Sequence, residues 1–118
     1  MKYIITIVIV ALSIFVFAQC NSENKKTEIM ETKTELKQII VDVRTTGEWN
    51  EDGHADCTVN YPLDSFGNKI EELKAYDKVI IVCRSGNRAG IAKQQLIASG
   101  YTKEVENLGA WQNVTCNK

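Results

Sequence analysis

The sequence lacks the patterns that mark several common classes of protein. It has a single histidine, His54, and no two of its four cysteines form a C-x-x-C pair, so a zinc site is not expected. Fourteen lysines and arginines balance fifteen acidic residues without clustering, which gives no indication of a nucleic-acid partner. Internal repeats and low-complexity tracts are also missing. We therefore expect one domain, with no metal and no cofactor.

The N-terminus has the features of an export signal. Lys2 precedes a run at 3–18 that is apolar apart from Thr6 and Ser13, and the run is short for a bilayer span of about 20 residues. The Val-Phe-Ala triplet at 16–18 fits the rule for signal peptidase cleavage. We predict a signal peptide over 1–18, a mature chain that begins at Gln19, and a periplasmic location. Lipidation at Cys20 is the alternative, which would make the protein a membrane-anchored lipoprotein.

The composition changes near residue 36. Residues 19–35 are polar and charged, which is typical of a solvated linker, and residues 36–118 are predicted to form the domain. Apolar runs predict strands at 39–43, 59–61, 79–82 and around 105, the third of them central. Helices are predicted after 46–49 and at 68–75, 88–99 and 111–114. Strands that alternate with helices predict an α/β domain with a mostly parallel sheet.

Cys83 is the strongest candidate for a catalytic residue. It follows the most apolar strand and precedes a loop with Gly86 that leads into a helix. Loop amides and a helix N-terminus both stabilise a thiolate. Active sites of parallel sheets lie beyond the carboxyl ends of the strands, where Asp42 is also expected. This placement favours a nucleophile over an inert core cysteine.

Three blocks of the sequence together resemble a single-domain rhodanese. They are IVDVR at 40–44 with GEW at 47–49, GH at 53–54 with VNYPL at 59–63, and CRSGNRA at 83–89. The segments at 100–102 and 105–107 fit the family's closing strand. The most similar subfamily is the exported phage shock protein E type, a periplasmic thiosulfate sulfurtransferase. The resemblance implies a rhodanese-like domain, with a mostly parallel central sheet flanked by helices on both faces.

The resemblance also implies roles for the loop. The thiolate of Cys83 would attack the outer sulfur of thiosulfate, hold it as a persulfide, and pass it to an acceptor such as cyanide or a thiol. Substrate binding is assigned to the residues that follow: Arg84, Ser85, Gly86, Asn87 and Arg88. Their amides would stabilise the anion, and the arginines suit sulfonate-like oxygens. The partners are thus a small-molecule sulfur donor and acceptor, with a protein persulfide acceptor and the oligomeric state left open.

Several polar residues near the loop have competing interpretations. Asp42 is a candidate for orienting the loop by accepting its amides or Arg88, and a structural hydrogen bond is weighted equally. Arg44 and Glu48 are four residues apart and are predicted to form a scaffold ion pair. His54 is predicted to stabilise a turn, because a thiolate with a depressed pKa needs no general base.

Two other functions compete with thiosulfate sulfurtransferase activity. One is a persulfide-carrying or sulfur-binding module without turnover of its own. The other, less favoured, is a cysteine-dependent phosphatase or arsenate reductase. Such phosphatases place five residues between cysteine and arginine, whereas Cys83 and Arg88 enclose four.

The remaining cysteines are candidates for a disulfide. Cys57 and Cys116 depart from the family pattern outside the active loop, and an exported domain lies in an oxidising compartment. We predict a Cys57–Cys116 bridge, with Cys20 as a competing partner. The bridge requires the two Cα atoms to lie within about 7 Å of each other.

Overall fold

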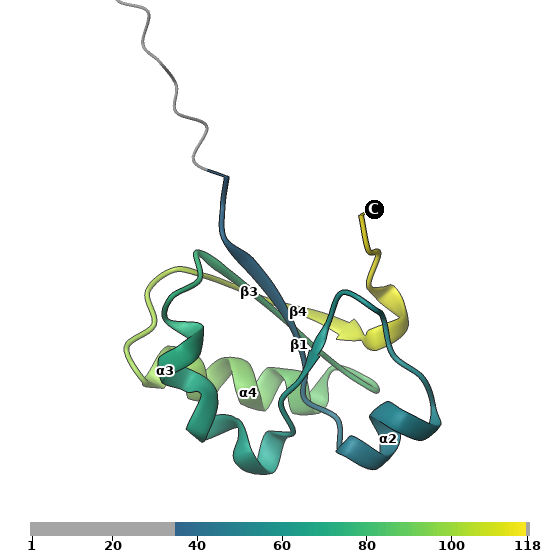
Figure 1. Cartoon of the computed structure of the whole chain (residues 1–118). Coiled ribbons are helices and arrows are strands. Elements are labelled where there is room, and N and C mark those ends of the chain that lie inside the picture. The colour runs from purple at the N-terminus through teal and green to yellow at the C-terminus, as the bar shows by residue number, and fades with distance from the viewer. Residues whose placement is uncertain (1–34, 118) are drawn as a thin grey trace, which may run out of the picture. The chain divides into compact units, whose positions relative to one another are not determined.

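A four-stranded parallel sheet forms the centre of the domain in the computed structural model, which describes residues 35–117. The strands are β1 (Gln38–Asp42), β2 (Val59–Asn60), β3 (Lys78–Cys83) and β4 (Glu104–Ala110). Their order is β2-β1-β3-β4, and every neighbouring pair is parallel (Figure 1). The predicted α/β class is confirmed. The predicted signal peptide and nearly all of the predicted linker lie outside the described residues.

The helices follow the predicted order with one difference. They are α2 (Thr46–Glu51), η1 (Leu63–Lys69), α3 (Ile70–Leu73), α4 (Asn87–Ala98) and η2 (Trp111–Asn113). The helix expected at 68–75 is instead a 3₁₀ helix that passes into a single α-helical turn, because Gly67 and Asn68 are weak helix formers. None of the helices described between residues 35 and 117 combines the length and apolarity needed to cross a bilayer.

One hydrophobic core holds these elements together. Val41 of β1 and Val79 and Ile81 of β3 contribute to it from the sheet. Helical residues complete the same cluster: Phe66, Leu73, Ala89, Ala92 and Leu96. Since Val41 is the register partner of Ile81, these strand side chains lie on one face of the sheet. The helices η1, α3 and α4 therefore pack against the same face.

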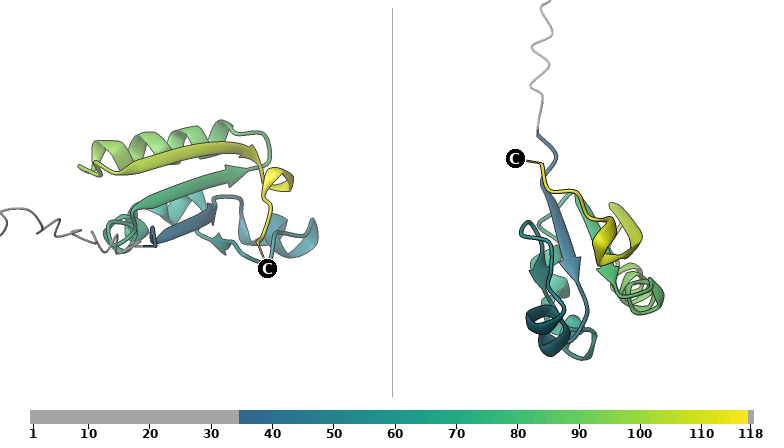
Figure 2. Two further views of the ribbon diagram at one scale, coloured as in Figure 1. Left: turned by 90° about the horizontal axis from the view of Figure 1, so that it is seen from above. Right: turned by 90° about the vertical axis from the view of Figure 1, so that its right-hand side faces the viewer.

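The second face of the sheet lies under the C-terminal segment. Ile80 and Val82 of β3 point to this face and are also buried, which confirms β3 as the central strand. Within the described residues, the C-terminal segment runs from the end of β4 at one edge of the sheet to the β2 edge (Figure 2). This segment, residues 111–116, forms a strap across that face and includes the short helix η2.

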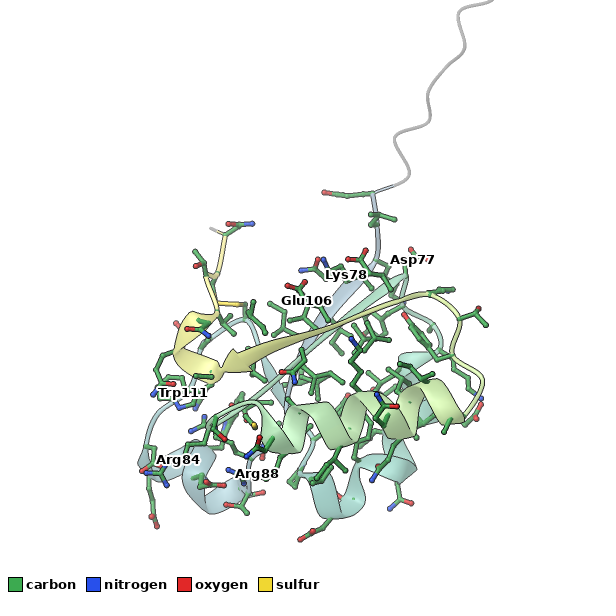
Figure 3. All side chains as sticks on the ribbon, turned by 180° about the vertical axis from the view of Figure 1, so that it is seen from behind. Asp77, Lys78, Arg84, Arg88, Glu106 and Trp111 are labelled. Carbon is green, nitrogen blue, oxygen red and sulfur yellow. A yellow bond between two sulfur atoms is a disulfide. The ribbon has the colours of Figure 1, made fainter. Side chains whose placement is uncertain are left out.

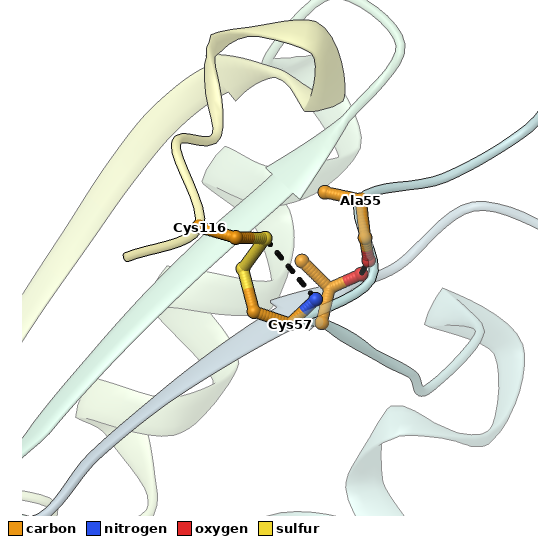
Figure 4. The surroundings of a disulfide bond; sticks show 4 residues. Ala55, Cys57 and Cys116 are labelled. Carbon is orange, nitrogen blue, oxygen red and sulfur yellow. Dashed lines mark hydrogen bonds between the residues drawn. A yellow bond between two sulfur atoms is a disulfide. The ribbon is translucent and has the colours of Figure 1, made fainter. Parts of the chain in front are cut away.

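A disulfide fastens this strap. Cys116 is bonded to Cys57, which lies two residues before β2, and the two Cα atoms are 5.6 Å apart (Figure 4). The Cys57 backbone N–H also donates to Sγ of Cys116 over 3.2 Å. The predicted bridge is confirmed, and Cys83 remains a free thiol.

Candidate active site

Cys83 lies at the bottom of a loop whose backbone turns toward its sulfur. It is the last residue of β3 and only 1% exposed. The backbone N–H of Gly86 donates to Sγ over 2.9 Å. Gly86 has a φ of 98° and is the N-cap of α4, so its lack of a side chain allows the left-handed turn.

The surroundings of Cys83 favour the thiolate. Burial raises the pKa of the thiol, but the backbone N–H groups of Ala89, Ser85, Gly86 and Arg88 together outweigh it and lower the pKa. Hydrogen bonds to the charged form stabilise it selectively. The loop therefore provides an anion cradle made of main-chain donors.

The loop residues named from the sequence separate into two groups. Arg84, Ser85 and Asn87 are exposed, whereas Gly86 and Arg88 are half-buried. Figure 3 shows Arg84 and Arg88 at the end of the domain near Trp111, away from Asp77 and Lys78. Arg84, Ser85 and Asn87 are therefore accessible to solvent in the loop that follows Cys83.

Arg88 is held by a partner on another helix. Its Nη1 and Nη2 donate to the two carboxylate oxygens of Glu48 over 2.7 and 2.9 Å. The Arg88 hydrogen bond is the largest cause that lowers the pKa of Glu48 to about 2. Glu48 also completes a capping box with Thr45 at the start of α2. The predicted Arg44–Glu48 pair is therefore wrong.

Arg44 instead pairs with Asp42. The carboxylate of Asp42 accepts from Nε, Nη2 and the backbone N–H of Arg44 at 2.8–3.0 Å, and both side chains are almost fully buried. The guanidinium also donates to the Gly53 carbonyl over 2.8 Å and lies 4.6 Å from the ring of Trp111. Asp42 thus orients Arg44, which favours the structural hydrogen bond over the loop-orienting role, the two interpretations that were given equal weight.

These pairs leave one loop cation for a substrate. Glu48 balances the charge of Arg88, and Asp42 balances that of Arg44. Arg84 forms no ion pair within residues 35–117. The arrangement therefore offers an anion the main-chain donors and one exposed guanidinium.

His54 takes part in a local structure outside the loop. Its Nδ1 lies 3.0 Å from the Trp49 carbonyl oxygen, and its ring stacks on that of Trp49 at 3.7 Å. This agrees with the predicted turn-stabilising role. In the part of the chain that the structure describes, no group of three or more His, Cys, Asp or Glu side chains could hold a metal ion.

One contact to the loop was not predicted. Asn107 of β4 donates from Nδ2 to the carbonyl oxygen of Gly86 over 2.9 Å. The Val-Glu-Asn segment at 105–107 was associated only with the closing strand. Its contact with the loop has no signal in the spacing of residues, because it depends on how β4 pairs with β3.

Comparison with known proteins agrees with this geometry. The model of the Rhodanese-like domain matches residues 25–115. The chain belongs to the rhodanese-like family. The rhodanese domain-containing protein CG4456 of Drosophila melanogaster is 31% identical over 85 residues, which cover 61% of this chain and 77% of that protein. The putative sulfur carrier protein YrkF of Bacillus subtilis is 32% identical over 66 residues, which cover 56% of this chain.

The rhodanese-like chain spans only about a third of YrkF, since the match covers 35% of that protein. Among solved structures, a rhodanese with anions from E. coli is similar with a TM-score of 0.59 and 27% identity. The match covers 68% of this chain and 94% of that one. The four-stranded parallel sheet with its helices is therefore a rhodanese fold.

Proposed function

We propose that this rhodanese-like protein is a sulfurtransferase that carries sulfane sulfur on Cys83. The observation that carries the proposal is the buried thiol with the Gly86 N–H donating to its sulfur over 2.9 Å. A ring of main-chain donors suits an anionic sulfur, first as thiolate and then as persulfide. The related putative sulfur carrier of Bacillus subtilis supports sulfur as the cargo.

The reaction has two steps. The thiolate of Cys83 attacks the outer sulfur of thiosulfate, an S–S bond forms, and sulfite leaves with the electron pair of the broken bond. Cyanide or a thiolate then attacks the terminal sulfur of the persulfide, and the electron pair of that S–S bond returns to Cys83. No net oxidation of the protein occurs, and the enzyme is regenerated.

Thiosulfate, or another anionic donor, is the proposed substrate class. Arg84 is the exposed loop arginine without an ion-pair partner in the described range, and its guanidinium suits sulfonate oxygens. The similarity to a rhodanese solved with anions supports an anionic donor. We assign Arg88 the different role of closing the loop, because its Nη1 and Nη2 both donate to Glu48.

The structure gives a further reason to prefer sulfur over phosphate. A phosphatase of this type needs its loop arginine free to grip a tetrahedral oxyanion, but Arg88 is engaged by Glu48. A sulfur carrier without turnover is the second candidate, and the putative carrier among the relatives supports it. The two candidates share the persulfide and differ in whether an acceptor receives the sulfur.

Mass spectrometry of the purified protein after incubation with thiosulfate tests the proposal. We expect one added sulfur on Cys83, release of sulfite, and thiocyanate when cyanide is supplied. Cys83→Ser should lower thiocyanate production on the order of a thousandfold or more. A persulfide without transfer to cyanide or thiols would establish the carrier. Near-normal activity of Cys83→Ser would contradict both candidates.

We also propose that the protein is exported, as expected of the phage shock protein E type. The Cys57–Cys116 disulfide supports this location, since such bonds persist in oxidising compartments. N-terminal sequencing of protein from the cell envelope should begin at Gln19. A chain that begins at a lipidated Cys20 would show a membrane-anchored lipoprotein instead.

A further inference from the structure

A β-bulge in β4 lies beside the active loop. The pairing of β3 with β4 shifts between Ile81 and Val82, so that Asn107 lies opposite Ile81 and Gly109 lies opposite Val82. Leu108 is the extra residue of the bulge. Gly109 has a φ of 83°, which glycine adopts without a clash. The bulge therefore interrupts the regular pairing of β3 with β4 close to Cys83, the last residue of β3.

The bulge packs directly against Gly86. A Cβ atom placed on Gly86 would lie 3.2 Å from the Cα of Gly109 and 3.6 Å from Oδ1 of Asn107. The loop approaches the bulge this closely because Gly86 has no side chain. This contact connects the last strand to the loop that surrounds the nucleophile.

The side chain of Asn107 bonds both sides of this contact. Its Oδ1 accepts from the backbone N–H of Gly109 over 3.0 Å, and its Nδ2 donates to the carbonyl oxygen of Gly86 over 2.9 Å. The same Gly86 carbonyl accepts from the N–H of Gly90 in the first turn of α4. Gly86 is thus held from the strand and from the helix at once.

We propose that Asn107 is a positioning residue for the nucleophile, which acts by fixing Gly86 so that its backbone N–H points at Sγ of Cys83. The N–H that reaches Sγ and the carbonyl that Asn107 holds belong to the same residue. Restricting the rotation of that residue therefore restricts the direction of its donor. A fixed donor favours the thiolate more than one that spends time pointing elsewhere.

An asparagine is suited to this position because it supplies one acceptor and one donor. An aspartate keeps the acceptor for Gly109 but turns an oxygen toward the Gly86 carbonyl. The charged groups of the loop and of the elements beside it are other residues: Arg84 and Arg88 in the loop, Glu48 on α2, and the Asp42–Arg44 pair at the end of β1. Asn107 changes none of these charges, so its removal tests the orientation of the donor alone.

The test is the pH dependence of iodoacetamide alkylation at Cys83, measured by peptide mass spectrometry on the full chain. We expect Asn107→Ala to react roughly threefold more slowly than the wild type near pH 7, which corresponds to a rise of about half a unit in the pKa of Cys83. We expect only this modest rise in the pKa of Cys83 because Asn107 is exposed. At a pH well above the thiol pKa the two rates should become equal.

Asn113→Ala is the matched control. Asn113 is also exposed and donates to the carbonyl oxygen of Leu108 in the same bulge over 3.0 Å, but it has no hydrogen bond to the loop. We expect its alkylation profile to match that of the wild type. An unchanged profile in Asn107→Ala, or an equal shift in both variants, would overturn the proposed role.

The consequence for catalysis rests on the proposed function. With thiosulfate as the donor, kcat/KM of Asn107→Ala should fall at neutral pH in proportion to the thiolate and recover at alkaline pH. The alkylation result does not depend on sulfur transfer. A shifted alkylation profile in a protein without sulfurtransferase activity would therefore refute the function and leave the positioning role intact.

Discussion

Breaking the Cys57–Cys116 disulfide should destabilise the domain strongly. The bridge joins residues 59 apart in the sequence, and the chain-entropy model assigns about 4 kcal/mol to a closed loop of that length. A domain of about 80 residues has a total stability of roughly 4–12 kcal/mol. Since the bridge also fastens the strap that crosses the second face of the sheet, its loss removes a large part of that stability.

Thermal unfolding followed by circular dichroism measures the effect. A loss of about 4 kcal/mol in a domain of this size corresponds to a fall in Tm of roughly 15–30 °C, and strain in the native bond would reduce it. We expect this fall after treatment with dithiothreitol and in Cys57→Ser. Cys83→Ser is the control: its disulfide is intact, so dithiothreitol should lower its Tm as in the wild type.

Two results would refute the reasoning. If the Tm values of the oxidised and reduced protein lie within about 3 °C of each other, the disulfide that fastens the strap contributes little to the stability of the domain. A further fall in Tm when Cys57→Ser is treated with dithiothreitol would show that another disulfide is present. Non-reducing peptide mapping would then identify its cysteines.

Three further predictions concern the charged residues around the loop. The pKa of Glu48 is lowered to about 2, chiefly by the Arg88 hydrogen bond, so the stability that this carboxylate contributes is present above about pH 4.5 and is lost as the pH falls toward 2. Glu48→Gln should therefore lose less stability than the wild type as the pH falls through that window. An equal fall in the Tm of both proteins with decreasing pH would contradict this. Arg84→Ala should lower kcat/KM for thiosulfate roughly 10- to 100-fold with little change in Tm, and Arg84→Lys should restore it partly; unchanged kinetics in Arg84→Ala would remove it from the substrate site. Asp42→Ala should destabilise the fold by about 3–5 kcal/mol in urea unfolding, because it leaves the buried charge of Arg44 unpaired, and a loss below about 1 kcal/mol would contradict the structural role of the pair.

The sequence by itself determined the order of the strands and helices and the position of the candidate nucleophile. It also predicted the Cys57–Cys116 bridge, with Cys20 as a competing partner, and the structure shows which pair forms. Apolar runs identify β1 and β3 because buried parallel strands are apolar on both faces. Cys83 is identifiable because the strand, the glycine loop and the helix that place its sulfur are consecutive in the chain. A local pattern of this kind is contained in adjacent residues, and the structure confirms that Cys83 lies at the end of β3, before the loop and α4.

The tertiary structure alone decided which charges pair. Spacing of four residues suggested Arg44 with Glu48, but helix α2 begins only at Thr46, so the geometry that brings positions i and i+4 together does not apply to Arg44. Glu48 instead reaches Arg88, 40 residues away. Which cations remain free for a substrate therefore depends on the packing of α2 against the start of α4.

The same holds for the strap and for the support of the loop. The strap covers the second face of the sheet, whereas η1, α3 and α4 pack on the first. The alternation of strands and helices in the sequence does not show which segment covers which face. Asn107 reaches Gly86 through a one-residue shift in the pairing of β3 and β4. A register shift follows from contacts between distant segments. The sequence therefore identified the candidate nucleophile, while the fold determined what holds its loop in place.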